Sequence, residues 1–219
     1  MRKFIYLVLA LVVLLGFSVQ VEKKAYSQEQ SSIKKAYVAG GCFWCVEADF
    51  EKKLGVIGVV SGYAGGKVVN PTYKQVSKGN TGHIEAVEIT YDANIVTYEE
   101  LLTYLYTHID PLDGGGQFCD RGYQYKSAIF PVNEKETKIA QKVTKWAYKQ
   151  LKKEIKTKLL PYINFYSAEG YHQDYYKKNP LRYNYYKYSC GRDKRVLSVW
   201  KDYKASEESQ ILPQKALNE

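Results

Sequence analysis

The stretch Lys35–Glu47, KAYVAGGCFWCVE, changes character at a pair of glycines. Its first residues, Lys35–Val38, are typical of a short β-strand that ends at Gly40-Gly41. Apolar residues then recur at helical spacing, and Gly55 closes the segment. These apolar residues are Phe43, Val46, Phe50 and Leu54. The stretch therefore predicts a strand-to-helix junction, with Cys42 at or next to the helix N-terminus.

Strand and helix patterns alternate along the rest of the chain. Further strands are expected at 56–63, 84–91, 125–130 and 162–166. Helical segments are expected at 72–78, at 98–108 behind a capping box of Thr97 and Glu100, and from Asn133 onward. Some connections are too short for parallel crossovers. The pattern predicts a single α+β domain whose helices pack on a mixed β-sheet, as in a ferredoxin-like two-layer sandwich.

Residues 1–20 differ in composition from the rest of the chain. Arg2 and Lys3 precede an uncharged run, Phe4–Phe17, and a polar segment comes after it. This order is typical of a secretory signal peptide, or of an N-terminal anchor if it is not cleaved. The run is shorter than the roughly 20 residues that span a bilayer comfortably. We therefore expect the folded part to be exported and periplasmic or otherwise extracytoplasmic.

The net charge of +9 could suit nucleic acid or an anionic membrane surface. However, many lysines lie together in the helical stretch 142–158, where they indicate a solvated helix face. The sequence carries no nucleic-acid-binding motif. We expect no nucleic-acid partner, and membrane contact only through the N-terminal segment if it remains uncleaved.

The chain has four cysteines, at positions 42, 45, 119 and 190. In an exported protein they could form two structural disulfides. The C-x-x-C pair, Cys42 and Cys45, also fits a redox couple or half of a zinc site. Zinc needs two further ligands close together, and Cys119 and Cys190 lie far apart with no second C-x-x-C. A metal site is therefore disfavoured.

Cys42 is placed to be reactive. The thiolate is the nucleophilic form of cysteine, and a helix N-terminus lowers the pKa of a thiol. Gly40 and Gly41 would leave space for a substrate. Phe43 and Trp44 could form the wall of a small apolar pocket beside the sulfur, although core packing accounts equally well for Phe43.

The strand IEAVEITY at 84–91 gives an independent indication. Because side chains alternate along a strand, Glu85 shares a face with Val87, Ile89 and Tyr91, whereas Glu88 lies on the other face. Burial on an apolar face raises the pKa of a carboxyl group, and a neutral carboxylic acid can donate a proton. Alternatively, Glu85 lies in water at a frayed strand end.

Several motifs, in order and spacing, resemble the peptide methionine sulfoxide reductase A family. They are GGCFWCVE at 40–47, GYAGG at 62–66, NPTY at 70–73, GHIEAVEITYD at 82–92, CDRGYQYKSAIF at 119–130 and YHQDYYKKNP at 171–180. The resemblance continues to Cys190-Gly191-Arg192 and covers nearly the whole mature domain. It implies a catalytic domain at 35–203. Composition outside the match adds a signal peptide or N-terminal anchor at 1–20, a linker at 21–34 and a polar tail at 204–219.

The resemblance implies a peptide-methionine (S)-S-oxide reductase that acts on free or protein-bound methionine sulfoxide and repairs oxidised proteins. In this reaction Cys42 attacks the sulfoxide sulfur and becomes a sulfenic acid, while neutral Glu85 donates to the oxygen. Tyr73 and Tyr125 resemble hydroxyl donors to that oxygen, and Asp120 resembles a polar residue of the site. Phe43 and Trp44 would hold the substrate methyl group. His83 and His172 are expected to be structural.

A second thiol is needed to convert the sulfenic acid to a disulfide. Cys190 is the first choice as this resolving cysteine, Cys45 the second and Cys119 the third. The resemblance implies no bound cofactor or metal, a thioredoxin-like dithiol as external reductant, and a monomer. Two other functions stay open from the residues: a thiol–disulfide oxidoreductase using Cys42 and Cys45, and a binding module with two disulfides.

Overall fold

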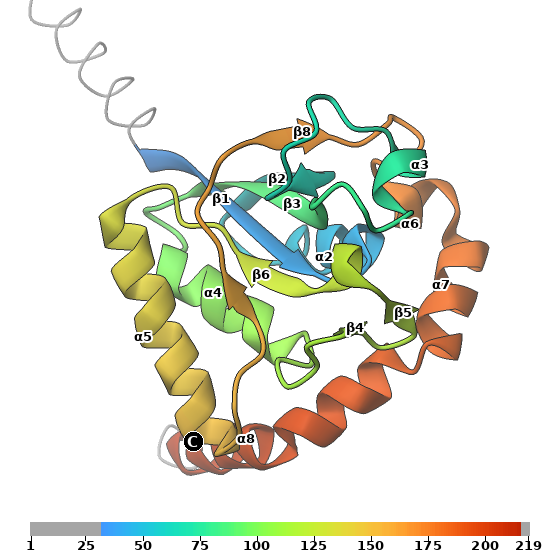
Figure 1. The fold of residues 1–219 in the computed structure, drawn as a ribbon. Helices are drawn as coiled ribbons and strands as arrows, with labels where there is room; N and C mark the ends of the chain where they lie inside the picture. The colour runs from blue at the N-terminus through green and yellow to red at the C-terminus, as the bar shows by residue number, and fades with distance from the viewer. Residues whose placement is uncertain (1–31, 216–219) are drawn as a thin grey trace, which may run out of the picture.

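The computed structural model describes residues 32–215, with side chains for 32–203. One sheet of order β7-β6-β1-β3-β2-β8 forms the centre of the domain (Figure 1). Its strands are β1 (Ile33–Gly40), β2 (Val56–Ala64), β3 (Ile84–Asp92), β6 (Ser127–Ile129), β7 (Lys158–Leu159) and β8 (Phe165–Ser167). The helices are α2 (Phe43–Phe50), α3 (Tyr73–Val76), α4 (Tyr98–Thr107), α5 (Glu134–Leu151), α6 (Tyr175–Lys178), α7 (Pro180–Ser189) and α8 (Arg192–Lys215).

Antiparallel pairing dominates the sheet. β3 lies between β1 and β2, with Val38 opposite Val87 and Tyr63 opposite Glu85. β6 pairs antiparallel with the other edge of β1, and β7 adds to β6 in parallel. The prediction of one α+β domain with helices on a mixed sheet is therefore confirmed.

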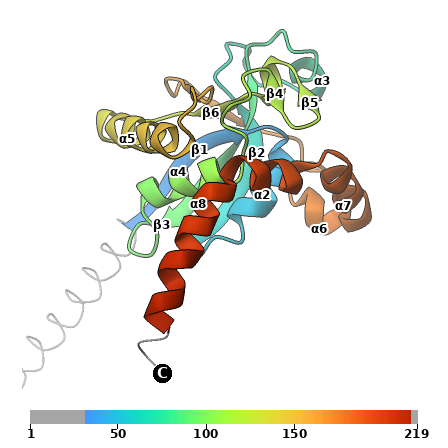
Figure 2. The ribbon, with the colours of Figure 1, turned by 90° about the horizontal axis from the view of Figure 1, so that it is seen from below.

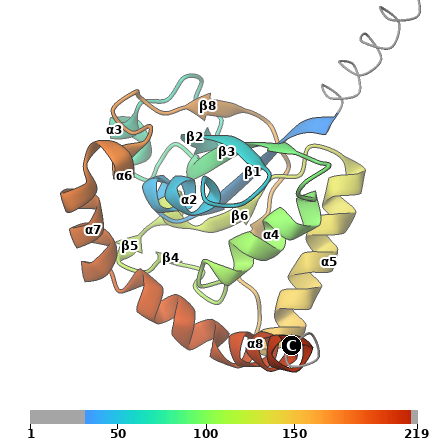
Figure 3. The same cartoon turned by 180° about the vertical axis from the view of Figure 1, so that it is seen from behind.

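The helices α2 and α4 lie on the same face of the sheet (Figure 3). Their apolar sides meet Val87, Ile89 and Tyr91 of β3 in the main core, together with buried Leu101 and Leu105 of α4. α4 begins where the sequence predicts, because the Thr97 side chain accepts a hydrogen bond from Glu100 N and Glu100 accepts one from Thr97 N. This capping satisfies amide groups that would otherwise lack partners.

Several predicted boundaries were wrong. α2 ends at Phe50, so Leu54 lies outside it and is 78% exposed. The expected strand at 125–130 is shorter, because Tyr123–Tyr125 forms a 3₁₀ turn before β6. The segment after Gly114 contains a small hairpin of β4 (Gly116–Gln117) and β5 (Asp120–Arg121). The last strand is confined to β8, Phe165–Ser167.

The C-terminal third contains helices that the sequence patterns did not predict. α6 and α7 lie beside α2, and α8 extends past the sheet toward the C-terminus (Figure 2). Polar side chains and tyrosines alternate in α7 without a clear apolar stripe, which explains why periodicity missed it. The proposed polar tail begins inside α8.

The predicted leader and nearly all of the predicted linker lie outside the described residues. β1 begins at Ile33, slightly before the predicted end of the linker. Within residues 32–215, no helix is long and apolar enough to cross a membrane.

Candidate active site

Cys42 lies at the junction that the sequence predicts, at the N-cap position of α2 directly after β1. Gly41 makes the sharp turn possible, because its φ of +87° is a left-handed conformation that favours glycine. A Cβ at Gly41 would lie 2.5 Å from Gln117 Cβ, and one at Gly40 would lie 2.9 Å from Ile109 Cγ2. The glycines therefore serve backbone geometry and close protein packing; the space beside them is filled by side chains, not left for substrate.

The predicted low pKa of Cys42 was wrong in direction. The residue is only 7% exposed, and burial raises the pKa of its thiol well above the ordinary value. The neighbouring Cys45 thiol and the carboxyl groups of Glu85 and Asp120 raise it further. Loss of solvation and nearby negative charge thus outweigh the helix N-terminus. Cys42 is a protonated thiol in the substrate-free protein.

Glu85 is buried, as the strand alternation predicts. It is 2% exposed, and its Oε2 accepts a hydrogen bond of 3.1 Å from Phe43 N in the first turn of α2. Burial raises the pKa of Glu85 to about 8, although the Phe43 amide opposes this shift. The Glu85 side chain therefore carries a proton at neutral pH, next to the Cys42 backbone.

Tyr73 and Tyr125 approach the same place from two different loops. Tyr73 opens α3, and its backbone N donates to Glu169 Oε1 at 2.8 Å. A hydrogen bond joins the Tyr73 and Tyr125 side chains, and burial followed by the Glu85 charge raises the pKa of both. Both hydroxyls thus remain protonated and can donate hydrogen bonds.

Asp120 reaches the site from β5. Its Oδ2 accepts a hydrogen bond from the hydroxyl of Tyr186 on α7. Burial raises the pKa of Asp120, while the Tyr186 hydrogen bond and the Arg192 charge lower it in part. The structure thus brings together Cys42, Glu85, Tyr73, Tyr125 and Asp120, which the sequence analysis had assembled from separate motifs.

Phe43 and Trp44 differ in their surroundings. Phe43 is 1% exposed and lies against Tyr63 and His172, with ring centroids 5.9 and 5.0 Å away. Trp44 is half-buried and stacks on Tyr175 at a centroid distance of 3.7 Å. Trp44 Nε1 also donates to His172 Nδ1 at 3.0 Å. His172 therefore orients the indole. His83, the residue before β3, accepts a hydrogen bond from Gly66 N, and its other ring nitrogen bonds to Val68 O.

The cysteines divide into two pairs. Cys119 and Cys190 form a disulfide with a Cα–Cα distance of 4.9 Å, whereas Cys42 and Cys45 are free and buried. The Cys42 and Cys45 side chains are joined by a hydrogen bond that, against burial, holds the pKa of Cys45 below its ordinary value. Cys190, the preferred resolving cysteine from sequence, is thus already paired, and Cys45 is the free thiol that contacts Cys42.

Sequence reasoning missed several contributors. Tyr186 binds Asp120, and Glu169 binds both Tyr73 N and the Tyr63 hydroxyl. Both belong to the tyrosine-rich segment after Tyr162, whose unusual composition was the available signal. The contacts themselves depend on how α6 and α7 return to α2, which no local pattern specifies.

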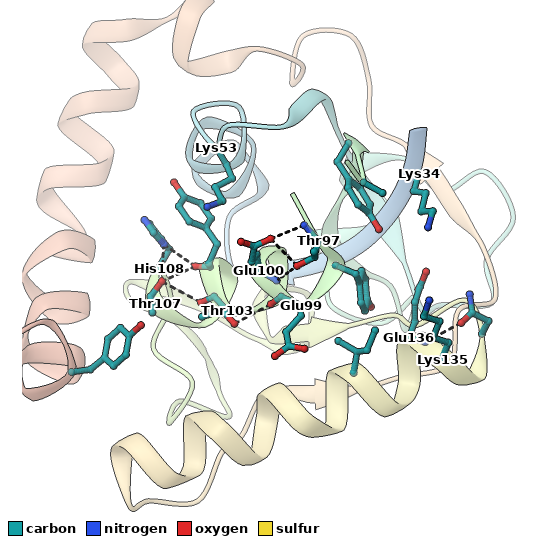
Figure 4. Close-up of a pocket in the computed structure, with 17 residues that line it drawn as sticks. Lys34, Lys53, Thr97, Glu99, Glu100, Thr103, Thr107, His108, Lys135 and Glu136 are labelled. Carbon is teal, nitrogen blue, oxygen red and sulfur yellow. Dashed lines mark hydrogen bonds between the residues drawn. The ribbon is translucent and has the colours of Figure 1, made fainter. Parts of the chain in front are cut away.

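Two other features lie outside this site. The carboxylates of Glu47, Glu51 and Asp174 lie within 4.8 Å of one another, a spacing suited to a metal ion. Lys177 Nζ, however, lies 2.6 Å from Glu51 and 2.8 Å from Asp174, so an ammonium group is already paired with two of the three carboxylates. A groove of about 910 Å³ runs along α4, between Lys53 and Glu136 (Figure 4), and includes none of the candidate catalytic residues.

The family model described as peptide methionine sulfoxide reductase matches residues 34–204. Over 199 residues the chain is 48% identical to the peptide methionine sulfoxide reductase MsrA/MsrB of Vibrio cholerae, covering 90% of this chain and 52% of that protein's length. It is 46% identical over 173 residues to MsrA of Halalkalibacterium halodurans, covering 78% of this chain and 98% of that one.

Solved structures agree with this similarity. Reduced Mxr1 from Saccharomyces cerevisiae has a TM-score of 0.66 at 31% identity, over 68% of this chain and 87% of that chain. Methionine sulfoxide reductase A of Corynebacterium diphtheriae has a TM-score of 0.66 at 34% identity, over 68% of this chain and 76% of that chain.

Proposed function

This chain belongs to the peptide methionine sulfoxide reductase family, oxidoreductases that reduce methionine sulfoxide, and we propose that it acts on the S-epimer, free or in proteins, through Cys42. The observation that carries this proposal is the pairing of a buried thiol with a buried carboxylic acid. Glu85, with a pKa of about 8, holds a proton beside Cys42, and two tyrosine hydroxyls converge there. Repair of oxidised proteins follows from this reaction.

In the first step the Glu85 proton moves toward the sulfoxide oxygen as the Cys42 sulfur attacks the sulfoxide sulfur. This attack forms an S–S bond between the Cys42 sulfur and the methionine sulfur. The protonated oxygen then passes from the methionine sulfur to the Cys42 sulfur. The old S–O bond and the S–S bond break as the new S–O bond forms, so methionine leaves and Cys42 becomes a sulfenic acid. The methionine sulfur gains two electrons and the Cys42 sulfur loses two. The thiol proton of Cys42 passes to the Glu85 carboxylate and restores the carboxylic acid. Cys42 therefore does not have to be a stable thiolate before substrate binds.

The other residues prepare the oxygen and the methyl group. Tyr73 and Tyr125 hydrogen-bond the sulfoxide oxygen, since burial keeps both hydroxyls protonated. Trp44, fixed by Tyr175 and His172, packs on the S-methyl group, with Phe43 supporting it from the core. Asp120, held by Tyr186, lines the polar side of the site.

We propose Cys45, rather than Cys190, as the resolving cysteine. Its side chain contacts Cys42, whereas Cys190 is bonded to Cys119. Cys45 displaces the hydroxyl of the Cys42 sulfenic acid: the S–O bond breaks as the S–S bond forms, and hydroxide leaves as water with one proton. The N-terminal turn of α2 must loosen for this bond, because the two cysteines are one turn apart.

Replacing Cys45 with serine tests this assignment. Reduced Cys45→Ser enzyme should release methionine in a first turnover and then retain a sulfenic acid that dimedone traps. The Cys119→Ser/Cys190→Ser enzyme should still form a disulfide after turnover, because its two remaining thiols are Cys42 and Cys45. Peptide mass mapping measures both results. Disulfide formation in Cys45→Ser together with its loss in the double variant would instead assign resolution to Cys190.

A thioredoxin-like dithiol completes the proposed cycle by reducing the Cys42–Cys45 disulfide, so that no bound cofactor or metal takes part. The leader-like segment at 1–20 supports export, with the domain in the periplasm or another extracytoplasmic space and membrane contact only through an uncleaved leader. There the dithiol would receive electrons across the membrane. We propose that the enzyme acts as a monomer without a nucleic-acid partner. The strand order β6-β1-β3-β2 supports a ferredoxin-like two-layer arrangement.

A further inference from the structure

The β4–β5 hairpin is tied to the end of α7 and the start of α8 through three successive residues (Figure 1). Each of the three residues meets a partner that follows or belongs to these C-terminal helices. The three contacts, which we call the hairpin junction, are Phe118 with Arg192, Cys119 with Cys190, and Asp120 with Tyr186. The junction therefore includes Asp120, a residue of the candidate active site.

The disulfide is the covalent contact of the hairpin junction and lies near the surface. Cys119 is exposed and Cys190 is half-buried, whereas Cys42 and Cys45 are both buried. The other two contacts are a cation–π contact at 4.7 Å and a single hydrogen bond. A dithiol in solution can therefore reach this disulfide without entering the active site, and its reduction would leave only the two noncovalent contacts of the junction.

Tyr186 connects the hairpin junction to both walls of the active site. Its hydroxyl donates a hydrogen bond to Asp120 Oδ2 on the polar side. Its ring lies edge-on to the ring of Trp44, with centroids 6.0 Å apart and an interplanar angle of 81°. Trp44 is two residues from Cys42 in the chain. A change in the position of Tyr186 would therefore disturb the polar and the apolar side of the site together.

Arg192 anchors the other end of the hairpin junction in the core. It is 3% exposed, and its Nη1 donates to Gly40 O at 3.3 Å. Its Nη2 donates to His108 O at 3.0 Å and to Asp49 Oδ2 at 3.3 Å. Gly40 ends β1, two residues before Cys42. The start of α8 is therefore fixed to the same part of the protein that carries the nucleophile.

The two strands of the hairpin are held in different ways. Gln117 of β4 is buried, and its side chain makes two hydrogen bonds to the backbone of Asp110, at 2.7 and 2.9 Å. Arg121 of β5 is exposed, and its Nη2 donates to Asp113 of the same loop at 3.0 Å. β4 is thus fixed to the body of the domain. The position of Asp120 on β5 relative to α7 depends instead on the hairpin junction.

Building on the proposed reductase function, we propose that the Cys119–Cys190 disulfide is a redox latch that positions Asp120 and Tyr186 for binding of the sulfoxide substrate. While the disulfide is intact, the hairpin stays against the end of α7 and the active site keeps its shape. Reduction by a dithiol opens the latch and weakens substrate binding. Tyr186 and the two latch cysteines act through Asp120 and Trp44 and are positioning residues, not groups that touch the substrate.

The latch opens by thiol–disulfide exchange. One thiolate of the dithiol attacks a latch sulfur, the S–S bond of the latch breaks, and a mixed disulfide forms. The second thiol of the dithiol then attacks its own sulfur in this mixed disulfide and releases the protein. Cys119 and Cys190 together gain two electrons and two protons, and the dithiol becomes a disulfide. The thioredoxin-like reductant of the proposed cycle is a dithiol of this class.

The test measures first-turnover methionine release against the concentration of free methionine-S-sulfoxide, in the full-length enzyme and with no dithiol in the assay. Two unlatched forms are compared with the latched parent: the parent after reduction with dithiothreitol and desalting, and the Cys119→Ser/Cys190→Ser variant. Thiol titration under denaturing conditions identifies the state, because reduction of the latch adds two thiols to those of Cys42 and Cys45. Tyr186→Phe removes the hydroxyl that holds Asp120 but keeps the ring.

Two matched controls change residues next to the hairpin junction. Arg121→Gln breaks a contact within the hairpin loop that does not reach α7 or α8. Tyr185→Phe removes a hydroxyl from the neighbouring position of α7, where the side chain is 75% exposed. Both controls should bind substrate as the parent does.

We expect the half-saturating substrate concentration to rise roughly tenfold in both unlatched forms, as when a hydrogen bond to a charged group is lost, and to rise less in Tyr186→Phe. The maximal first-turnover rate should stay close to that of the parent, because Cys42 and Glu85 lie outside the hairpin junction. Adding Tyr186→Phe to the Cys119→Ser/Cys190→Ser variant should have a smaller effect than in the parent, since both changes act through Asp120.

An unchanged half-saturating concentration in folded, unlatched enzyme would overturn the latch. So would a loss of maximal rate together with a lower thermal unfolding midpoint and no change in half-saturation, because that result indicates a general structural role. If Cys119→Ser/Cys190→Ser does not fold, the reduced parent and Tyr186→Phe decide the question. Failure of the latched parent to release methionine at any substrate concentration would instead refute the reductase function itself.

Discussion

Replacing Cys42 with serine is expected to abolish methionine formation, with a loss of about 10⁴-fold or more. A serine hydroxyl cannot take the place of a sulfur that must accept oxygen and lose two electrons. Among the described residues, the free thiol beside Cys42 is Cys45, which takes no part in the first step of the proposed mechanism. Methionine released from methionine-S-sulfoxide in the presence of dithiothreitol gives the rate.

The control for this variant is Cys45→Ser, which changes a buried thiol of the same helix. It should retain the first turnover, although it cannot form the Cys42–Cys45 disulfide. Comparable first-turnover release from Cys42→Ser would contradict the assignment of the nucleophile, provided that both proteins show the same thermal unfolding midpoint.

Replacing Glu85 with glutamine is expected to slow the first step by about 10²- to 10⁴-fold, the usual contribution of a general acid. Glutamine retains the shape of the side chain and can still accept the hydrogen bond from Phe43 N, but it has no acidic proton. Pre-steady-state release of methionine measures this step separately from reduction of the disulfide.

The pH dependence gives a second signature of Glu85. Because burial raises its pKa to about 8, the acid is protonated below that pH and deprotonated above it. The first-step rate of the parent enzyme should therefore fall as the pH rises through about 8. Glu85→Gln should lack this decline, since glutamine does not titrate.

Glu88 provides the matched control, because it lies on the same strand but on the opposite face. It accepts hydrogen bonds from Lys35 Nζ at 2.7 Å and from the Tyr37 hydroxyl at 2.8 Å, away from Cys42. Glu88→Gln should leave the first step and its decline above pH 8 essentially unchanged. A thiol–disulfide oxidoreductase would behave differently, because it would tolerate Glu85→Gln as well.

The sequence was sufficient to locate the central elements, because their signals are local. Alternation along β3 predicted that Glu85 is buried, and the glycine pair predicted a junction before Cys42. Thr97 and Glu100 predicted the start of α4 through a side-chain contact three residues apart. Each of these features depends on residues close together in the chain.

The ionisation of Cys42 could not be predicted in the same way. A helix N-terminus is visible in the sequence, but the burial of the thiol and its approach to Glu85 and Asp120 arise only when separate segments meet. The favourable helix dipole is a local property, whereas the loss of solvation is not. In the proposed mechanism, activation of Cys42 consequently depends on the proton of Glu85 and not on a preformed thiolate.

The pairing of the cysteines also depends on long-range contacts. Four cysteines allow three pairings of two disulfides, and sequence alone does not choose among them. Cys119 meets Cys190 because α7 ends against the β4–β5 hairpin, while α2 keeps Cys45 beside Cys42. The same return of the chain brings Tyr186 to Asp120 and Arg192 to Gly40 O at the end of β1.

Peptide mass mapping after a single turnover is the most direct test of the proposed chemistry. The enzyme, with Cys42 and Cys45 reduced, is mixed with methionine-S-sulfoxide without a dithiol and is then quenched with a thiol-alkylating reagent. We predict stoichiometric methionine, a new Cys42–Cys45 disulfide and an unchanged Cys119–Cys190 disulfide. If methionine were released and the reagent still alkylated Cys42, Cys42 would have remained a free thiol. That result would contradict the role of Cys42 as the nucleophile.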